Sequence, residues 1–270
     1  MRSSQPPPSP AANASVPGVG PRVVLVRPRG GINVGAVCRV IKNFGGGELV
    51  IVDGDFDRRQ ARDFAVHAGD VLDAHRAAPT LAQALSGTSL VVGTTARGGS
   101  YRERTRDVRE VATDLAAACV AAELGALPPA LVFGPEDSGL SNEDIACCHE
   151  LACVSTGPIY PSLNLSHAAA ITLYEVLLAR LSSDHAAVVG EPTVLADAAE
   201  LEAALVGLES SLLAIGFFRD ETADHMMQSL RALFGRARMD ARDVRILRGI
   251  ASQIEWFSNG GHRVLATKRP

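Results

Sequence analysis

The chain has 270 residues, of which 47% are hydrophobic and 21% are charged, and its formal net charge at pH 7 is -4. This composition is ordinary for a globular protein with a real core, in one large domain or in a main domain plus a smaller one. It argues against a wholesale electrostatic grip on nucleic acid, so any RNA binding must be local. No apolar run reaches the roughly 20 residues that span a bilayer, and no secretory signal is apparent. We therefore expect a cytoplasmic protein with no membrane partner.

The chain begins with a segment that we expect to be a disordered leader. Residues 1–20 are rich in Pro, Ser, Ala and Gly and have no hydrophobic periodicity. The β-branched run at 22–27 then predicts a buried strand, followed by a helix from Asn33, as N-cap, to Phe44. The apolar face of this helix follows i, i+3, i+4, i+7 spacing and consists of Val37, Val40, Ile41 and Phe44.

Arg39 lies nearly opposite that apolar face, with Lys42 beside it. Arg39 therefore cannot serve the core contact of its own helix. An ordinary solvated basic face is one interpretation, and a functional cation is the other.

Strands and helices alternate through the next part of the chain. The pattern predicts strands at 48–53, around 90–94, at 130–133 and at 151–154, and helical segments at 57–67, 80–86, 108–123 and 165–181. Such alternation predicts an α/β domain with a mainly parallel sheet. Neither a dinucleotide-binding glycine fingerprint nor a phosphate-binding P-loop is present.

Two other local features have competing interpretations. The segment 97–109 is strongly charged, and it is either a solvated loop or, at the ligand-binding end of a strand, an RNA contact. The consecutive residues Cys147, Cys148 and His149 suggest a metal site or a Cys/His nucleophile. However, adjacent side chains cannot converge on one ion as C-x-x-C pairs do. We favour small packing residues, free thiols at all five cysteines, and no metal.

The C-terminal third is expected to be helical. Residues 182–194 have the composition of a linker, 195–260 predict three helices, and 261–270 form a tail. The segment 229–248 carries six arginines against two aspartates, a net charge of +4, and is the most basic part of the chain. In the last helix one side is predicted to be apolar (Leu247, Ile250, Ile254, Phe257), and another side carries Arg242, Arg245 and Arg248.

Three motifs resemble those of the SpoU branch of the SPOUT RNA methyltransferases. They are NVGAVCR at 33–39, FGPEDSGL at 133–140 and STGPIYPSLNLS at 155–166, in the family's order and spacing. The segments LVVGTTAR, LLAIGFFR, LRALFGRARM and VRILRGI further resemble the TrmJ group, which are bacterial tRNA 2'-O-ribose methyltransferases acting at position 32 of the anticodon loop.

The resemblance implies a fold, a cofactor and an assembly. Residues 21–181 would form the SPOUT domain, with a C-terminal trefoil knot, and 195–260 a small helical domain that binds RNA and supports a homodimer. The family binds S-adenosylmethionine in the knot, largely through backbone groups. By resemblance that site falls on Thr94, Thr95, Ala96, Gly134, Val154, Ser162 and Leu163.

The resemblance also assigns catalytic and substrate residues. Arginine is a poor general base, so Arg39 is expected to hold a substrate phosphate and stabilise the developing alkoxide. Asn33, Glu136, Ser162 and Asn164 would orient Arg39, the ribose and the turn, although helix capping alone is the alternative for Ser162 and Asn164. RNA contacts are expected from Arg39, Lys42, Arg97, Arg242, Arg245 and Arg248.

The sequence therefore predicts an S-adenosylmethionine-dependent 2'-O-methyltransferase of tRNA, at nucleotide 32. The alternatives are a ribosomal RNA enzyme of the same chemistry and a catalytically inactive RNA-binding protein of the same fold. We also expect the helical region to supply RNA affinity and to be dispensable for cofactor binding.

Overall fold

The structure is a computed structural model that describes residues 20–96, 105–183, 194–218 and 223–261. Within these ranges the strands form one seven-stranded sheet in the order β3-β2-β1-β6-β4-β7-β5, and every neighbouring pair is parallel. The predicted α/β class with a parallel sheet is thus confirmed. The strands are β1 (Arg22–Val26), β2 (Leu49–Val52), β3 (Arg76–Ala78), β4 (Val91–Thr94), β5 (Thr105–Asp107), β6 (Ala130–Phe133) and β7 (Glu150–Cys153).

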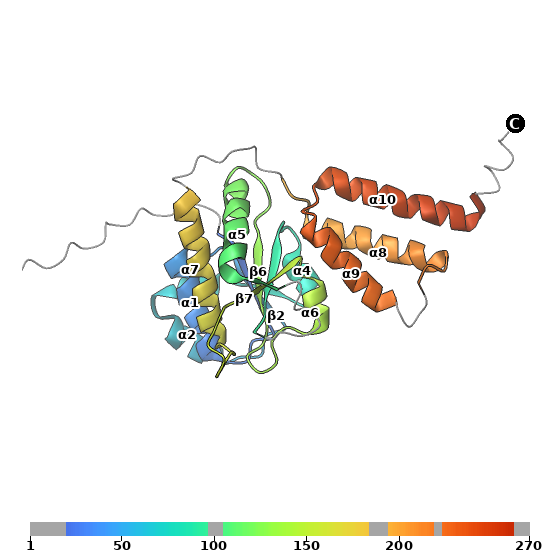
Figure 1. Cartoon of the computed structure of the whole chain (residues 1–270). Coiled ribbons are helices and arrows are strands. Elements are labelled where there is room, and N and C mark those ends of the chain that lie inside the picture. The colour runs from blue at the N-terminus through green and yellow to red at the C-terminus, as the bar shows by residue number, and fades with distance from the viewer. Residues whose placement is uncertain (1–19, 97–104, 184–193, 219–222, 262–270) are drawn as a thin grey trace, which may run out of the picture.

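Helices cover both faces of the sheet (Figure 1). Alternate residues of β1 point to opposite faces, so Val23 and Leu25 join one core cluster and Val24 and Val26 the other. The first cluster includes residues of α1 (Gly31–Phe44), α2 (Arg58–Ala65), α3 (Gly69–Asp73), α5 (Val108–Glu123) and α7 (Leu165–Ser183). The second includes residues of α4 (Leu81–Leu85), α6 (Asn142–Ala146) and the start of α8 (Ala198–Ala214).

The chain also contains short elements that the sequence pattern did not predict. Strand β3 has three residues, and β5 lies inside the charged segment 97–109, where a solvated loop or an RNA contact was expected. Both are edge strands of the sheet, and β5 pairs with β7. Arg106 in β5 bonds Asp114 and Glu150, so its charge is neutralised within the fold. A short 3-10 turn, η1 (Val66–Ala68), links α2 and α3.

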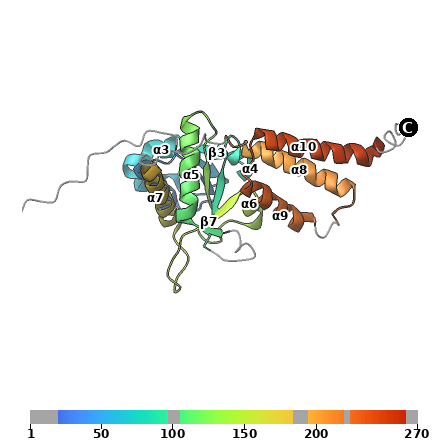
Figure 2. The same cartoon turned by 45° about the horizontal axis from the view of Figure 1, so that its top comes forward.

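Among the described residues after 194, the C-terminal helical region contains three helices, α8, α9 (Ala223–Arg236) and α10 (Ala241–Trp256), followed by a short η3 turn (Phe257–Gly261). Figures 1 and 2 show it beside the sheet, on the side away from α1 and α7. Its core includes Leu205, Met227 and Val244. Two residues of the predicted apolar side of α10, Ile250 and Phe257, are about half exposed. The helix buries a narrower face, made by Val244, Leu247 and Ala251, with Ile254 partly buried against it.

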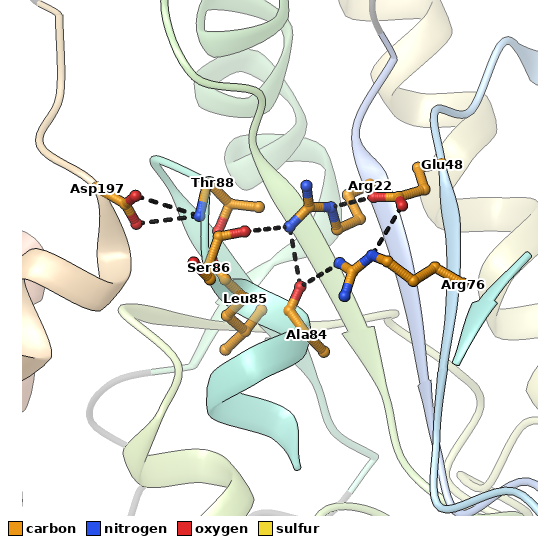
Figure 3. Close-up of polar contacts among 9 residues, drawn as sticks. Arg22, Glu48, Arg76, Ala84, Leu85, Ser86, Thr88 and Asp197 are labelled. Atoms are coloured by element: carbon orange, nitrogen blue, oxygen red, sulfur yellow. Dashed lines mark hydrogen bonds and ion pairs between the residues drawn. The ribbon is translucent and has the colours of Figure 1, made fainter. Parts of the chain in front are cut away.

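One junction fastens the helical region to the sheet at α4 (Figure 3). Asp197 caps α8 through the Ala199 amide and also accepts the Gly87 amide at 3.2 Å. The Ala198 amide donates to the Thr88 carbonyl at 2.8 Å. Next to these contacts, Arg22 donates to the carbonyls of Ala84 and Ser86. Both Arg22 and Arg76 also pair with Glu48. These guanidinium groups satisfy carbonyls that the end of α4 leaves without helical partners.

A second junction holds α9 and the turn after it. Arg238 pairs with Asp114 at 2.5 Å and lies near Glu150 at 3.6 Å, beside Arg106. Gly235 packs so closely on His149 that a Cβ atom there would lie 2.8 Å from the His149 Cα. Only glycine fits at such a contact without moving the backbone. Ion pairs and a close contact at a glycine therefore both fix the position of α9 beside β7.

We predict that His149 makes the fold sensitive to acid. Burial lowers the pKa of His149 to about 4, and its Nδ1 accepts the Val91 amide. Between about pH 6.5 and pH 4 the unfolded chain binds the proton and the folded chain does not, so stability falls as the pH falls through this window. The expected loss is at most about 3 kcal/mol. Urea unfolding of the wild type and of His149→Gln should show a smaller loss in the variant. The control replaces the exposed His67 instead. Parallel pH profiles for the wild type and His149→Gln would contradict the prediction.

Within the part of the chain that is described, no helix combines the length and apolar character that crossing a bilayer requires. The predicted leader at 1–20 lies outside the described residues except for its last residue. The same holds for residues 184–193 of the predicted linker, although α7 extends to Ser183. The predicted tail, apart from Gly261, is also outside them.

Candidate active site

A cavity of about 860 Å³ lies at the carboxyl edge of the sheet, where β6, β4 and β7 are neighbours. Ligands of open α/β sheets bind at this edge, and small-molecule sites usually measure about 300–1,000 Å³. The loops after the three strands line the cavity. All seven residues predicted to bind the cofactor are on its wall: Thr94, Thr95, Ala96, Gly134, Val154, Ser162 and Leu163.

The loop after β6 is tightly folded around Gly134. A Cβ atom at this position would lie 2.3 Å from the Leu140 amide nitrogen and 2.4 Å from the Gly139 carbonyl carbon. Gly139 itself has φ +71°, a left-handed conformation that favours glycine. The backbone of the loop at Gly139 and Leu140 therefore lies directly against Gly134. This packing leaves no room for a side chain at residue 134.

The end of that loop is anchored by the first turn of α6. Ser141 and Asp144 form a reciprocal capping box. Arg27, which follows β1, forms an ion pair with Asp144. Burial opposes ionisation of Asp144, but the bonds from Arg27 and Ser141 outweigh it and hold the pKa of that carboxyl below its usual value. The loop is thus held to the neighbouring strand end by a charged and partly buried contact.

The loop after β7 is tied to the edge strand. The Ser155 hydroxyl donates to the Asp107 carboxylate at 2.6 Å, and the same carboxylate caps α5 through the Arg109 amide. These two hydrogen bonds, with the Ser155 bond the larger cause, lower the pKa of Asp107. The third sequence motif is therefore positioned by β5, the strand that the sequence did not predict.

A polar cluster joins three of the five predicted catalytic residues. The Asn33 amide group donates to Glu136 at 2.8 Å, and the Asn164 amide group donates to the Asn33 side-chain oxygen at 2.9 Å. The Gly30 amide also donates to Glu136, at 3.2 Å. Residues from all three sequence motifs thus converge in one hydrogen-bonded chain.

One helix-capping prediction needs correction, and the capping alternative holds for Asn164 but not for Ser162. The N-cap of α1 is Gly30 and not Asn33, whose side chain is engaged with Glu136 and Asn164 instead. At α7, Asn164 accepts the Ser166 amide at 2.9 Å, so it both caps the helix and joins the cluster. Ser162 makes no capping contact within the described residues; it is exposed and lines the cavity.

Arg39 projects from α1 away from the core, as the helical periodicity predicts. It is exposed, and within the described ranges it has no ion pair and no hydrogen bond. It is also not among the residues that line the cavity of its own chain. Lys42, by contrast, is paired with Asp70 at 2.9 Å and bonds the His67 carbonyl. Arg97 lies outside the described residues.

Part of the positive charge of segment 229–248 is neutralised by ion pairs within the fold. Arg231 pairs with Glu202 and Glu209, and Arg238 with Asp114. The three arginines predicted to contact RNA remain exposed on α10 and have no ion pair among the described residues, although Arg248 donates to the Glu200 carbonyl: Arg242, Arg245 and Arg248.

Three residues of the cavity lining come from the helical region, where the sequence predicted no part of the cofactor site. His225, Gln228 and Ser229 of α9 line the same cavity as the strand loops. They belong to no motif, and the only available signal is their i, i+3, i+4 spacing on one helix face. Their position also conflicts with the expectation that the helical region is dispensable for cofactor binding.

The cysteines fit the packing interpretation. All five are free thiols, and burial raises the pKa of Cys38 to about 12 and that of Cys147 to about 11. Such thiols are poor nucleophiles at neutral pH. Across the described ranges, no group of three or more His, Cys, Asp or Glu side chains is arranged to hold a metal ion. The absence of a metal stays a prediction.

The fold and the cavity define an α/β protein with a cavity of small-molecule size at the carboxyl edge of a parallel sheet, next to a polar cluster. A family model described as the SpoU rRNA Methylase family matches residues 20–174. A second model, described as the C-terminal domain of the tRNA methyltransferase TrmJ, matches residues 199–266. The chain therefore belongs to the SpoU methylase family and, within it, to the TrmJ group.

Curated relatives resemble the chain over most of its length. The tRNA (cytidine/uridine/adenosine-2'-O-)-methyltransferase TrmJ of Pseudomonas aeruginosa (strain UCBPP-PA14) is 36% identical over 253 residues, covering 88% of this chain and 95% of that protein. The tRNA (cytidine/uridine-2'-O-)-methyltransferase TrmJ of Escherichia coli (strain K12) is 37% identical over 242 residues, covering 88% and 96%. Among solved structures, TrmJ from Z. mobilis ZM4 has a TM-score of 0.72 at 27% identity, covering 87% of this chain and 99% of that one.

Proposed function

We propose that the protein transfers a methyl group from S-adenosylmethionine to a ribose 2'-hydroxyl of tRNA, at nucleotide 32 of the anticodon loop. The observation that carries this proposal is the convergence of the three motifs on one cavity and one polar cluster. Membership of the family supports the reaction type. The names of the two curated relatives support tRNA and the 2'-oxygen, and a tRNA substrate would place the reaction in the cytoplasm.

The cavity suits the proposed methyl donor in size and lining. Its apolar residues include Phe133, Ile145 and Leu151, which match the flat apolar faces of an adenine ring. The loops at 94–96 and 134–140 line the same space, and we assign their backbone groups as hydrogen-bond partners for the polar edges of the donor. When bound, S-adenosylmethionine would supply an electrophilic methyl group on a sulfonium. The protein's own task is to place the ribose hydroxyl and to stabilise the charge that develops on it.

We assign Arg39 as the cation that stabilises the negative charge developing on the ribose 2'-oxygen. Its guanidinium is solvent-exposed and free to bind a substrate phosphate in two parallel hydrogen bonds. As the developing alkoxide forms, a nearby fixed positive charge lowers the barrier, with the phosphate available as the proton acceptor. Glu136, Asn33 and Asn164 are not assigned to stabilise this developing charge. Their hydrogen bonds fix the start of α1 relative to the two loops.

We also predict a homodimer. Arg39 does not line the cavity of its own chain, so a second copy would have to bring an Arg39 side chain to each cavity. The exposed face of α7 carries apolar residues, Tyr174, Leu178 and Leu181, that a partner could cover. Light scattering at micromolar concentration should report twice the mass of the 28.3 kDa chain. A stable monomer that methylates tRNA would contradict the prediction.

The substrate assignment is tested by mapping the methyl group. Unmodified tRNA is incubated with the protein and a labelled methyl donor, digested, and analysed by mass spectrometry. The mark is expected on the ribose of nucleotide 32. A mark at another tRNA position would refute the position, and a mark only in ribosomal RNA fragments would favour the ribosomal alternative. The trefoil knot stays a prediction of the family resemblance.

We predict that α10 supplies part of the tRNA affinity. Replacing Arg242, Arg245 and Arg248 by glutamine should weaken tRNA binding and flatten its salt dependence. Each lost phosphate contact lowers the slope of log K against log salt by about 0.7–0.9. A control makes the same charge change in α2, at Arg58, Arg59 and Arg62, of which Arg58 and Arg62 are paired with Asp73. Filter binding at several salt concentrations measures both, and equal slopes for the two triple variants would remove α10 from the RNA interface.

A further inference from the structure

The wall of the cavity that faces the helical region is formed by α9. Its residues His225, Gln228 and Ser229 line the same space as the strand loops. They are spaced i, i+3 and i+4, so their side chains lie on one face of the helix. The neighbouring residues Ala223 and Met227 are buried in the core of the helical region. The helix thus presents an apolar side to its own bundle and a hydrogen-bonding side to the cavity.

The position of α9 is fixed by contacts that follow this polar face along the chain. Toward the C-terminus, Gly235 lies against His149, and Arg238 in the following turn pairs with Asp114. Along the helix, Arg231 pairs with Glu202 of α8, and Glu202 and Arg231 border a smaller cavity against α4 and α6. A helix held in this way cannot leave the cavity without breaking charged contacts and a close glycine contact.

The chemistry of the three side chains suits a polar ligand. Histidine and glutamine side chains have both donor and acceptor atoms, and Ser229, whose hydroxyl donates to the His225 carbonyl at 3.1 Å, keeps its oxygen as an acceptor. The strand loops provide the apolar part of the cavity, including Leu151 and Val154. A ligand with one flat apolar group and several hydroxyl, amino or carboxylate groups would use both walls.

We infer that α9 forms part of the methyl-donor site, and that His225, Gln228 and Ser229 hydrogen-bond to polar groups of S-adenosylmethionine within the same chain. This inference rests on the proposed placement of the donor in the cavity. It assigns to the helical region a second role besides RNA affinity. Because α9 leads directly into α10 and its exposed arginines, the donor and the RNA would then bind to two ends of one connected unit.

The test measures binding of S-adenosylhomocysteine to the full-length chain by calorimetry. The triple variant His225→Ala, Gln228→Ala, Ser229→Ala should bind about tenfold or more weakly, since each lost hydrogen bond typically lowers affinity several-fold. The matched control replaces Met226 and Leu233, which are exposed residues of the same helix outside the cavity lining, and should bind normally. If the triple variant is unstable, the three single variants give the same comparison.

Four outcomes separate this inference from the proposed placement itself. If Gly134→Trp and the triple variant both lose binding, the inference stands. If Gly134→Trp loses binding and the triple variant retains it, the donor occupies the cavity without α9, and the inference is overturned. It is also overturned if the triple variant keeps its affinity for S-adenosylhomocysteine but loses tRNA methylation, because α9 would then contact the RNA. Normal binding in both variants would refute the placement of the donor.

Discussion

Replacing Arg39 by alanine is expected to lower the rate of methyl transfer by about 100-fold or more and to leave donor affinity unchanged. Arg39 lies outside the cavity and has no ion pair or hydrogen bond in the described part of the chain, so its removal leaves no buried partner behind. Its proposed contribution is made in the transition state, where removal of one electrostatic partner commonly has an effect of this size. Single-turnover methylation of tRNA measures the rate, and calorimetry with S-adenosylhomocysteine measures donor affinity.

The control for Arg39 is another exposed arginine. Arg59→Ala on α2 removes the same charge away from the motifs and should methylate normally. Arg39→Lys keeps a positive charge but loses the forked geometry, so it should recover only part of the rate. An Arg39→Ala protein with near-normal turnover would exclude this residue from the mechanism. Loss of donor affinity together with rate would instead mean that the residue supports the cavity.

Substitution at Gly134 is expected to abolish donor binding, and even alanine should have a large effect. The Cβ atom alone would collide with the backbone at Gly139 and Leu140, and backbone cannot move aside as a flexible side chain can. The loop that lines the cavity must therefore change shape in Gly134→Ala, and Gly134→Trp would also fill the space. We expect affinity for S-adenosylhomocysteine to fall by about 100-fold or more, which corresponds to roughly 3 kcal/mol.

A stability measurement distinguishes loss of the site from loss of the fold. Thermal unfolding of both Gly134 variants should be compared with that of Gly207→Ala, at a helical glycine of α8 with open space around its Cβ position. Alanine is the better helix former, so Gly207→Ala should be neutral or slightly stabilising. Undiminished donor binding in Gly134→Trp would contradict the proposed site, whatever its effect on stability.

Hydrophobic pattern and capping residues were sufficient for the long elements. The bounds predicted for α5 agree with the structure because Asp107 caps it and its apolar residues repeat at helical spacing. The exposure of Arg39 also follows from periodicity alone. By contrast, β3 and β5 are too short and too polar for any pattern, and they exist because longer strands offer them an unpaired edge.

Long-range contacts explain what the sequence could not predict about the site. Asparagine is a residue type typical of helix N-caps, but the side chain of Asn33 bonds Glu136 from a distant loop instead. Arg231 and Arg238 belong to the most basic segment of the chain, yet acidic partners from other elements neutralise them. The cavity residues were found only through resemblance to a family, and the contribution of α9 belongs to no motif. In each case the deciding partner is remote in sequence and adjacent in space.

The order of strands in the sheet has a consequence for synthesis on the ribosome. β1 can pair with β2 as soon as both have emerged, but the partners of β4 in the described sheet are β6 and β7. β6 also inserts between β1 and β4, so the centre of the sheet cannot close before residue 133 is available. Until then the apolar strand β4 emerges without a partner. Parallel sheets with such late, non-local pairing fold slowly and expose aggregation-prone edges, so the nascent chain should depend on chaperones more than its final stability would suggest.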